Sequence, residues 1–187
     1  MPTPLRGRDR EVACLREHLG RLRAGRAATW LIEGGAGLGK SRMLEEVISD
    51  SRAAGFAVGH GVAEPGDAAV QLAVLMNALF EGPAAPLERS SLGQSHTSPE
   101  QRYWLLQDIQ ALLEQAALRQ PIVVCLDDLQ WADSGTLAAL RTLPARLAPL
   151  PVGWVLAFRP GGGTDFDRTI TDLLRDGAGK ASLERLD

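Results

Sequence analysis

Short apolar runs alternate along the chain with longer segments in which apolar residues repeat at helical spacing. The runs of strand length cover residues 28–33, 56–60, 122–126, 152–158 and 182–186. The segments of helical period cover residues 40–55, 70–80, 99–116, 134–147 and 165–179. The run 122–126 shows no polar alternation, which is typical of a strand buried on both faces of a parallel sheet. The alternation therefore predicts an α/β fold, with a parallel five-stranded sheet and helices on both of its faces.

Two of the predicted helices have recognisable start signals. Ser98 would cap the first, with Pro99 at its first position and Gln101 placed to reach back to the cap. Asp133 would cap the second, in which Pro144 is expected to kink or end the helix. The core stripe expected on the first of these helices consists of Trp104, Leu105, Ile109, Leu112, Leu113 and Ala116.

Length and charge set broad limits. At roughly 150 residues per domain, the 187 residues predict one domain over 1–187, with a surface loop at 82–98. The net charge of −3 gives no reason to expect direct DNA binding or an anionic membrane as partner. The arginines within 6–26 alternate with acidic residues and predict a mostly solvated helix face. Two cysteines argue against a disulfide scaffold, and the lack of a targeting or long apolar segment predicts a cytoplasmic protein.

A glycine-rich loop stands between the first strand and the helix that follows it. Residues 34–41 match Gly-x4-Gly-Lys-Ser in full, in the strand–loop–helix context that this motif requires. Glycines let backbone N–H groups surround phosphate oxygens, and the helix N-terminus adds partial positive charge. Lys40 would reach the β- and γ-phosphates, and the Ser41 hydroxyl would ligate Mg²⁺. The residues predicted to bind the nucleotide phosphates are Gly34, Gly35, Ala36, Gly37, Leu38, Gly39, Lys40, Ser41 and Arg42.

Charged residues follow the two most apolar strands at the points where these strands end. Asp127 comes directly after 122–126 and would serve the magnesium ion. Because adjacent residues of an extended strand end point in opposite directions, Asp128 is expected to orient or deprotonate a water molecule. Arg159 ends the next strand and would sense a γ-phosphate or stabilise transition-state charge. The predicted catalytic set is Lys40, Asp128 and Arg159.

Four segments in this order resemble the nucleotide-binding core of signal-transduction ATPases with numerous domains, the STAND class of AAA-type P-loop ATPases. The resemblance is closest to large ATP-binding LuxR-family transcriptional regulators, and it rests on residues 5–11, 34–41, 124–133 and 156–160. It implies a P-loop NTPase core that uses ATP and Mg²⁺. It also implies that Gly7 and Arg8 lie against adenine and ribose, that Asp127 serves the magnesium and Asp128 the attacking water, and that Arg159 is the sensor arginine.

The resemblance also implies what is missing and how fast the domain works. Family members continue into a helical lid and effector domains, whereas these 187 residues reach about the last strand of the core, so the lid is expected to be lacking. Without a lid, water is less excluded and turnover is expected to be slow. Asp128 stands where many AAA ATPases carry Glu, which also favours slow turnover. The expected partners are ATP and ADP, with self-association or appended regulatory domains.

Three functions remain open at this point. The first is an ATP-driven switch in a transcriptional regulator, and the second is a phosphotransferase of the P-loop kinase type. The third is a nucleotide-binding scaffold without turnover. A dinucleotide site is disfavoured, because a Gly-x-Gly-x-x-Gly pattern that begins at Gly35 would need its third glycine where Lys40 stands. Nucleotide affinity and turnover separate the three.

Overall fold

The strands of the protein run parallel in one sheet. The structure is a computed structural model that describes residues 7–66, 69–81, 85–89 and 99–185. Among these residues the strands lie side by side in the order β2-β3-β4-β1-β5, which confirms the predicted parallel five-stranded sheet. The strands are β1 (Ala28–Gly34), β2 (Ala57–Val62), β3 (Ile122–Asp127), β4 (Val152–Phe158) and β5 (Gly179–Leu183).

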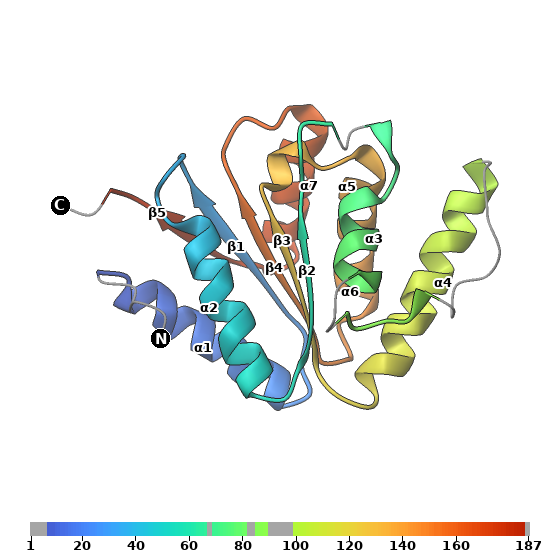
Figure 1. The fold of residues 1–187 in the computed structure, drawn as a ribbon, viewed down its shortest axis with the longest axis horizontal. Coiled ribbons are helices and arrows are strands. Elements are labelled where there is room, and N and C mark those ends of the chain that lie inside the picture. Colours follow the sequence, from blue (N-terminus) through green and yellow to red (C-terminus); the bar gives the residue numbers. More distant parts are fainter. Residues whose placement is uncertain (1–6, 67–68, 82–84, 90–98, 186–187) are drawn as a thin grey trace.

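Helices cover both faces of the sheet, as predicted. Figure 1 shows α1 and α2 on one side and α3, α4 and α5 on the other. Two separate apolar clusters match these layers, one beneath α1 and α2 and one beneath the helices from α3 onward. The helices are α1 (Asp9–Arg23), α2 (Lys40–Ala53), α3 (Ala73–Phe80), α4 (Pro99–Ala117), α5 (Ser134–Leu140), α6 (Leu143–Arg146) and α7 (Thr164–Arg175), with a 3₁₀ turn, η3 (Leu129–Trp131), after β3.

Alternate residues of the central strands feed the two clusters. Cys125 of β3 packs with the α1–α2 cluster, whereas its neighbours Val124 and Leu126 pack with the opposite one. Every residue of β3 and of β4 is buried, so the prediction of a strand buried on both faces is confirmed. Burial on both faces removes the polar alternation of an exposed strand and leaves a continuous apolar run.

The last strand was wrongly placed by the sequence pattern. It was expected at 182–186, but β5 begins at Gly179 and pairs with β1 from Trp30↔Gly179 to Gly34↔Leu183. β5 lies at the edge of the sheet, where its exposed positions need no apolar side chains. The apolar pattern therefore missed the first half of this strand.

The core stripe of α4 was partly wrong. Trp104 was expected in the core, yet 58% of its surface is exposed. The fully packed positions are Ile109, Leu113 and Ala117, each four residues apart, so they form one narrow line along the helix. Leu105, Leu112 and Ala116 are partly buried beside that line.

Helix boundaries were predicted with mixed success. The Asp133 cap is confirmed, since its side chain accepts a hydrogen bond from the backbone N–H of Thr136 at the start of α5. The break near Pro144 is also confirmed: α5 ends at Leu140, and Pro144 stands in the first turn of α6. The Ser98 cap lies outside the described residues. The predicted loop 82–98 is described only over 85–89, where Leu87 is buried against the core.

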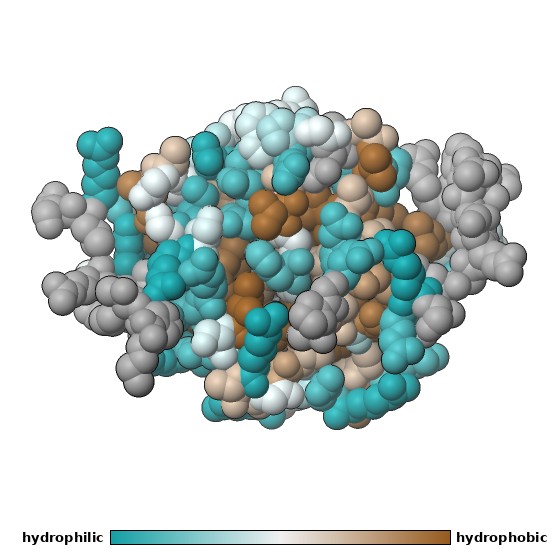
Figure 2. All heavy atoms as spheres, in the orientation of Figure 1, coloured by the Kyte–Doolittle hydropathy of each residue, from teal (hydrophilic) through white to brown (hydrophobic). Residues whose placement is uncertain are grey.

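The exposed surface mixes hydrophilic and hydrophobic residues. On the face seen in Figure 2, hydrophilic residues cover most of the surface, and hydrophobic residues show between them in small groups. Within the described ranges, no helix has the length and apolar character needed to cross a membrane.

Candidate functional site

The glycine-rich loop has the backbone that its sequence predicts. β1 ends at Gly34, and α2 begins at Lys40, so residues 35–39 form the turn between strand and helix. Gly37 and Gly39 have φ values of 73° and 91°, a region that residues with a Cβ rarely adopt. A Cβ on Gly34 would stand 3.1 Å from the Cβ of Leu183 on β5. These glycines are therefore required by the shape of the loop and by the close passage of β5.

Lys40 lies at the first turn of α2 with its ammonium group turned back into the loop. Its Nζ donates a hydrogen bond of 2.9 Å to the carbonyl oxygen of Gly35, and only 5% of the residue is exposed. Burial lowers the pKa of Lys40, the nearby Arg159 lowers it further, and Asp128 and Asp127 oppose both effects. The four charged groups therefore interact electrostatically at one edge of the sheet, the edge where β1, β3 and β4 end.

Ser41 and Arg42 complete the loop motif on the first turn of α2. Ser41 is exposed, so its hydroxyl is accessible beside Lys40. Arg42 forms an ion pair with Glu45 one turn later in the same helix, with an N–O distance of 2.9 Å. Both residues thus lie at the helix N-terminus, where partial positive charge favours phosphate oxygens.

The acidic pair does not have the geometry expected from an extended strand end. Asp127 is the last residue of β3 and is 5% exposed, and its Oδ1 accepts a hydrogen bond of 2.7 Å from the backbone N–H of Asp128. Asp128 adopts φ 49° and ψ 38°, the left-handed region, so the assumption of extended backbone at this residue was wrong. The two carboxylates nevertheless differ in environment, because the Asp128 side chain is 28% exposed.

Arg159 lies beside Asp128, and Gln130, which was not among the predicted site residues, forms hydrogen bonds to both. Arg159 Nε is 3.6 Å from Asp128 Oδ1. Gln130, in η3, donates a hydrogen bond of 2.8 Å from Nε2 to the same Oδ1 and accepts one of 2.9 Å from the backbone N–H of Arg159. The signals in the sequence were its proximity to the acidic pair and its place inside the segment 124–133 that carries the family resemblance.

Arg8 differs from the other arginines near the N-terminus. It is 7% exposed, and its guanidinium donates to the carbonyl oxygens of Leu38 and Glu184 and pairs with Glu11 at 3.1 Å. Leu38 belongs to the glycine-rich loop and Glu184 follows β5, so Arg8 ties both to the start of α1. Gly7, just before it, is exposed with φ 72°. The remaining described arginines of this segment are exposed, as predicted, namely Arg10, Arg16, Arg21, Arg23 and Arg26.

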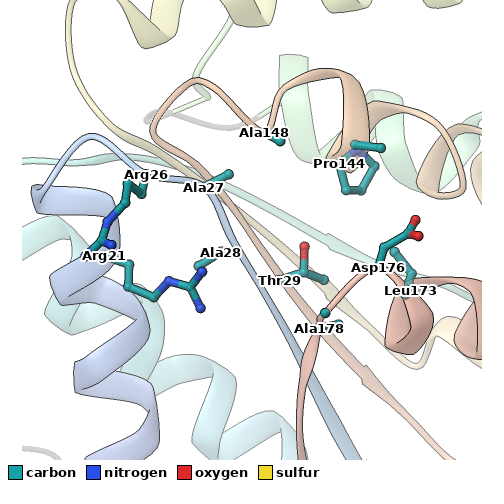
Figure 3. Close-up of a pocket in the computed structure, with 12 residues that line it drawn as sticks. Arg21, Arg26, Ala27, Ala28, Thr29, Pro144, Ala148, Leu173, Asp176 and Ala178 are labelled. Atoms are coloured by element: carbon teal, nitrogen blue, oxygen red, sulfur yellow. The ribbon is translucent and has the colours of Figure 1, made fainter.

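A cavity of ≈ 510 Å³ opens at the opposite end of the strands, where β1 and β5 begin. Figure 3 shows Arg21 and Arg26 on one side of it and Asp176 on the other, with Thr29 of β1 between them. None of the residues predicted for the nucleotide site lines this cavity. The predicted site is instead formed by the loops at the carboxyl ends of the strands, where ligands bind in open parallel sheets.

The fold and the loop together define the chain as an α/β domain of the P-loop NTPase-like type. The family model described as "AAA ATPase domain" matches residues 4–155. The chain therefore belongs to the AAA ATPase domain family. A comparison with curated proteins finds no match.

Solved structures share the architecture at low sequence identity. The chain superimposes on a chain of the structure of Drosophila ORC bound to DNA with a TM-score of 0.61 and 13% identity, covering 98% of this chain and 44% of that one. The chain also superimposes on a crystal structure of a DNA replication initiation factor with a TM-score of 0.56 and 15% sequence identity. That match covers 97% of this chain and 47% of the other. At such identities the likeness concerns the fold. The chain spans less than half the length of either structure.

Proposed function

We propose that this chain binds ATP with Mg²⁺ at the glycine-rich loop and hydrolyses it slowly, as the nucleotide switch of a signal-transduction regulator. The observation that carries the proposal is the meeting of Lys40, Asp127, Asp128 and Arg159 at one edge of the sheet. Lys40 lies at the start of α2, Asp127 ends β3, Asp128 follows β3, and Arg159 directly follows β4. Membership of the AAA ATPase family supports ATP as the nucleotide.

The loop residues 34–42 would hold the phosphates. Backbone N–H groups from Gly34, Gly35, Ala36, Gly37, Leu38 and Gly39, together with the N-terminus of α2, would surround phosphate oxygens. Lys40 would exchange its bond to the Gly35 carbonyl for a phosphate oxygen, and its burial strengthens that interaction by excluding water. Gly7 and Arg8 would lie toward adenine and ribose, as the resemblance to STAND ATPases implies.

The residues at the strand ends fit a magnesium ion. Asp127 supplies a carboxylate of which Oδ1 is already bonded, and within the described part of the chain no hydrogen bond reaches Oδ2. Ser41 adds an exposed hydroxyl, and hard oxygen donors of this kind suit Mg²⁺ better than nitrogen or sulfur. When bound, the ion neutralises charge on the phosphate oxygens.

Asp128 and Arg159 would carry out the hydrolytic step. A water oxygen bonds to the γ-phosphorus while the bond from that phosphorus to the β–γ bridging oxygen breaks, giving ADP and phosphate. Asp128 would orient this water and accept its proton, and the Arg159 guanidinium would stabilise charge on the γ-phosphoryl oxygens. An aspartate is shorter than the glutamate common in AAA ATPases, which supports slow turnover.

The switch itself would act on other parts of a larger assembly. ATP and ADP differ by the γ-phosphate, and only a ligand with different affinity for two conformations can shift their balance. Residues at the sheet edge that contact the γ-phosphate would therefore differ between the two nucleotide states. The STAND-type motifs support a LuxR-family transcriptional regulator that works in the cytoplasm, with self-association or appended domains as the responding element.

The test is a titration of the purified chain with a fluorescent ATP analogue and Mg²⁺, with phosphate release followed in the same samples. Lys40→Ala is the test variant, and Lys180→Ala, at the chain's other lysine, is the control. We expect saturable binding and slow phosphate release for wild type and Lys180→Ala, with binding lost in Lys40→Ala. A folded wild-type chain that does not bind the analogue would refute the proposal. Binding without phosphate release would support the scaffold instead.

A further inference from the structure

Gln130 joins the two strand ends that carry the acidic pair and Arg159. It lies in η3, directly after β3. Its Nε2 donates a hydrogen bond of 2.8 Å to Asp128 Oδ1, and its Oε1 accepts one of 2.9 Å from the backbone N–H of Arg159. Because both bonds come from one planar amide, they fix the position of the Asp128 carboxylate relative to the end of β4.

The two oxygens of the Asp128 carboxylate are used unequally. Oδ1 accepts the Gln130 bond and lies 3.6 Å from Arg159 Nε. Over the ranges that the structure covers, no hydrogen bond involves Oδ2. The rotation of the carboxylate is therefore set from one side, and the second oxygen keeps its full capacity to accept a proton.

Asp128 needs such support because its own surroundings hold it weakly. Its left-handed backbone, φ 49°, is unfavourable for a residue with a Cβ, and 28% of its side chain is exposed. A strained backbone persists only where neighbouring groups determine it. The Asp128 backbone is held by the Asp127 carboxylate on its N–H and by the Trp131 N–H on its carbonyl oxygen. The Asp128 carboxylate is held by the Gln130 amide and lies beside the Arg159 guanidinium.

We infer that Gln130 is a positioning residue for ATP hydrolysis. Its Nε2 holds Oδ1 of Asp128, so that Oδ2 serves the attacking water. Its Oε1 holds the backbone N–H of Arg159, which keeps Arg159 beside Asp128. The inference rests on the hydrolysis proposed above. It assigns to Gln130 an effect on the chemical step and little effect on ATP binding, since neither of its bonds involves the phosphate loop.

Two variants separate the effects of the two hydrogen bonds of the Gln130 amide. Gln130→Ala removes both bonds. Gln130→Glu keeps an oxygen that accepts from the Arg159 N–H but replaces the donor to Asp128 by a second carboxylate. Gln110→Ala is the matched control, because Gln110 also bridges an acid and an arginine, donating to Glu114 at 2.8 Å and accepting from Arg146 at 3.1 Å. That bridge joins α4 to α6, outside the proposed site.

Phosphate release and amide exchange are the two readouts. We expect kcat to fall by about tenfold or more in Gln130→Ala and Gln130→Glu, a part of the roughly 10²–10⁴-fold that a positioned proton acceptor contributes. The Kd for the fluorescent ATP analogue should change less than about threefold, which a general loss of folding would not produce. In the Asp128→Asn background, Gln130→Ala should cause no additional loss, because it acts through Asp128. Hydrogen exchange of the Arg159 N–H should quicken in Gln130→Ala and remain slow in Gln130→Glu and Gln110→Ala.

The inference is overturned if Gln130→Ala matches Gln110→Ala in kcat while wild type is active. It is also overturned if Gln130→Ala lowers kcat equally in the presence and absence of the Asp128 carboxylate. A wild-type chain that releases no phosphate contradicts the proposed function as well. Arg159 exchange then shows whether the bridge itself exists, because that readout needs no turnover.

Discussion

The ammonium group of Lys40 is bonded to the carbonyl oxygen of Gly35, five residues earlier in the same loop, at 2.9 Å. A lysine at the start of α2 thus closes the loop that precedes its own helix. Burial disfavours the charged form of Lys40 and lowers its pKa. The hydrogen bond to the Gly35 carbonyl oxygen partly offsets this cost. Phosphate oxygens carry more negative charge than a carbonyl, so they are the better acceptor at the same position.

The first prediction concerns stability and pH in Lys40→Met. Because the pKa of Lys40 is lowered from 10.5 in the folded chain, the unfolded chain binds more protons between the two values, and the free energy of unfolding rises with pH there. The penalty for burying the cation is therefore present at neutral pH and is relieved as pH approaches 10.5. Lys40→Met has no such penalty, so any stability advantage it has over wild type should narrow between neutral and alkaline pH. Denaturant unfolding of both proteins across this range checks the sign, and a widening gap would contradict it.

The second prediction concerns magnesium and Asp127→Asn. Removing one carboxylate charge should weaken Mg²⁺ binding at the site by roughly 100-fold, at the upper end of the effect known for groups that support metal ligands. ATP binding measured in EDTA should stay the same or tighten, because the variant repels the phosphates less. Titrations of the fluorescent ATP analogue with and without Mg²⁺ give both quantities. Equal Mg²⁺ dependence in wild type and Asp127→Asn would exclude Asp127 as a metal ligand.

The third prediction concerns Arg8, which ties α1 to the glycine-rich loop and to the segment after β5. Arg8→Met leaves the Leu38 and Glu184 carbonyl oxygens without this donor, so unfolding should be easier by about 2–3 kcal/mol. Affinity for ATP should fall as well, because the loop loses a support. Arg10→Met, on an exposed position of the same helix, is the control and should change both quantities little.

Arg8→Lys gives a finer test of the same contact. A lysine keeps the positive charge but lacks the planar fork that reaches three partners at once, so we expect an intermediate loss. Full recovery by lysine would mean that charge alone matters and that the hydrogen bonds to the Leu38 and Glu184 carbonyl oxygens do not contribute. Denaturant unfolding and the nucleotide titration, run on the same preparations, distinguish these results.

The fourth prediction concerns Asp133, whose carboxylate joins α5 to the turn before α3. It is 1% exposed and accepts from the Leu72 N–H at 2.6 Å, the Thr136 N–H at 2.8 Å and the Thr136 hydroxyl at 2.6 Å. Asp133→Ala leaves these buried donors unpaired and should lower the free energy of unfolding by about 2–4 kcal/mol. Asp165→Ala, in the exposed first turn of α7, should cost well under about 1 kcal/mol. Similar losses in both would mean that the buried network does not matter.

How far the sequence predicts this molecule depends on the kind of signal. The glycine-rich loop and the run 122–126 were read correctly because backbone conformation and full burial each leave a strong local pattern. Trp104 was misplaced because helical spacing identifies one face of a helix but does not show which positions on that face are covered by other elements. The start of β5 was missed because an edge strand needs few apolar residues.

In the candidate site, too, only the features with a local sequence pattern were predicted. The sequence predicted a site made of Lys40, Asp127, Asp128 and Arg159 from their places at strand and loop ends, and the parallel topology brings these ends together. It did not predict the left-handed backbone of Asp128, or the Gln130 bridge between the segment after β3 and the segment after β4. Contacts between segments 29 residues apart in the chain leave no periodic trace in sequence.

The fifth prediction sets two glycines against each other. α3 packs directly on the backbone of β2, and a Cβ on Gly59 would meet the carbonyl oxygen of Ala78 at 2.3 Å, so Gly59→Ala should cost about 2 kcal/mol or more as helix and strand separate. Gly20 lies inside α1 with nothing within 4 Å of its would-be Cβ, and Gly20→Ala should stabilise the chain by about 0.5–1 kcal/mol through helix propensity. Denaturant unfolding with unchanged m-values measures both. A Gly59→Ala variant as stable as wild type would show that α3 does not lie as close to β2 as in the structure. The expected changes in the free energy of unfolding have opposite signs because a backbone neighbour is present at Gly59 and absent at Gly20.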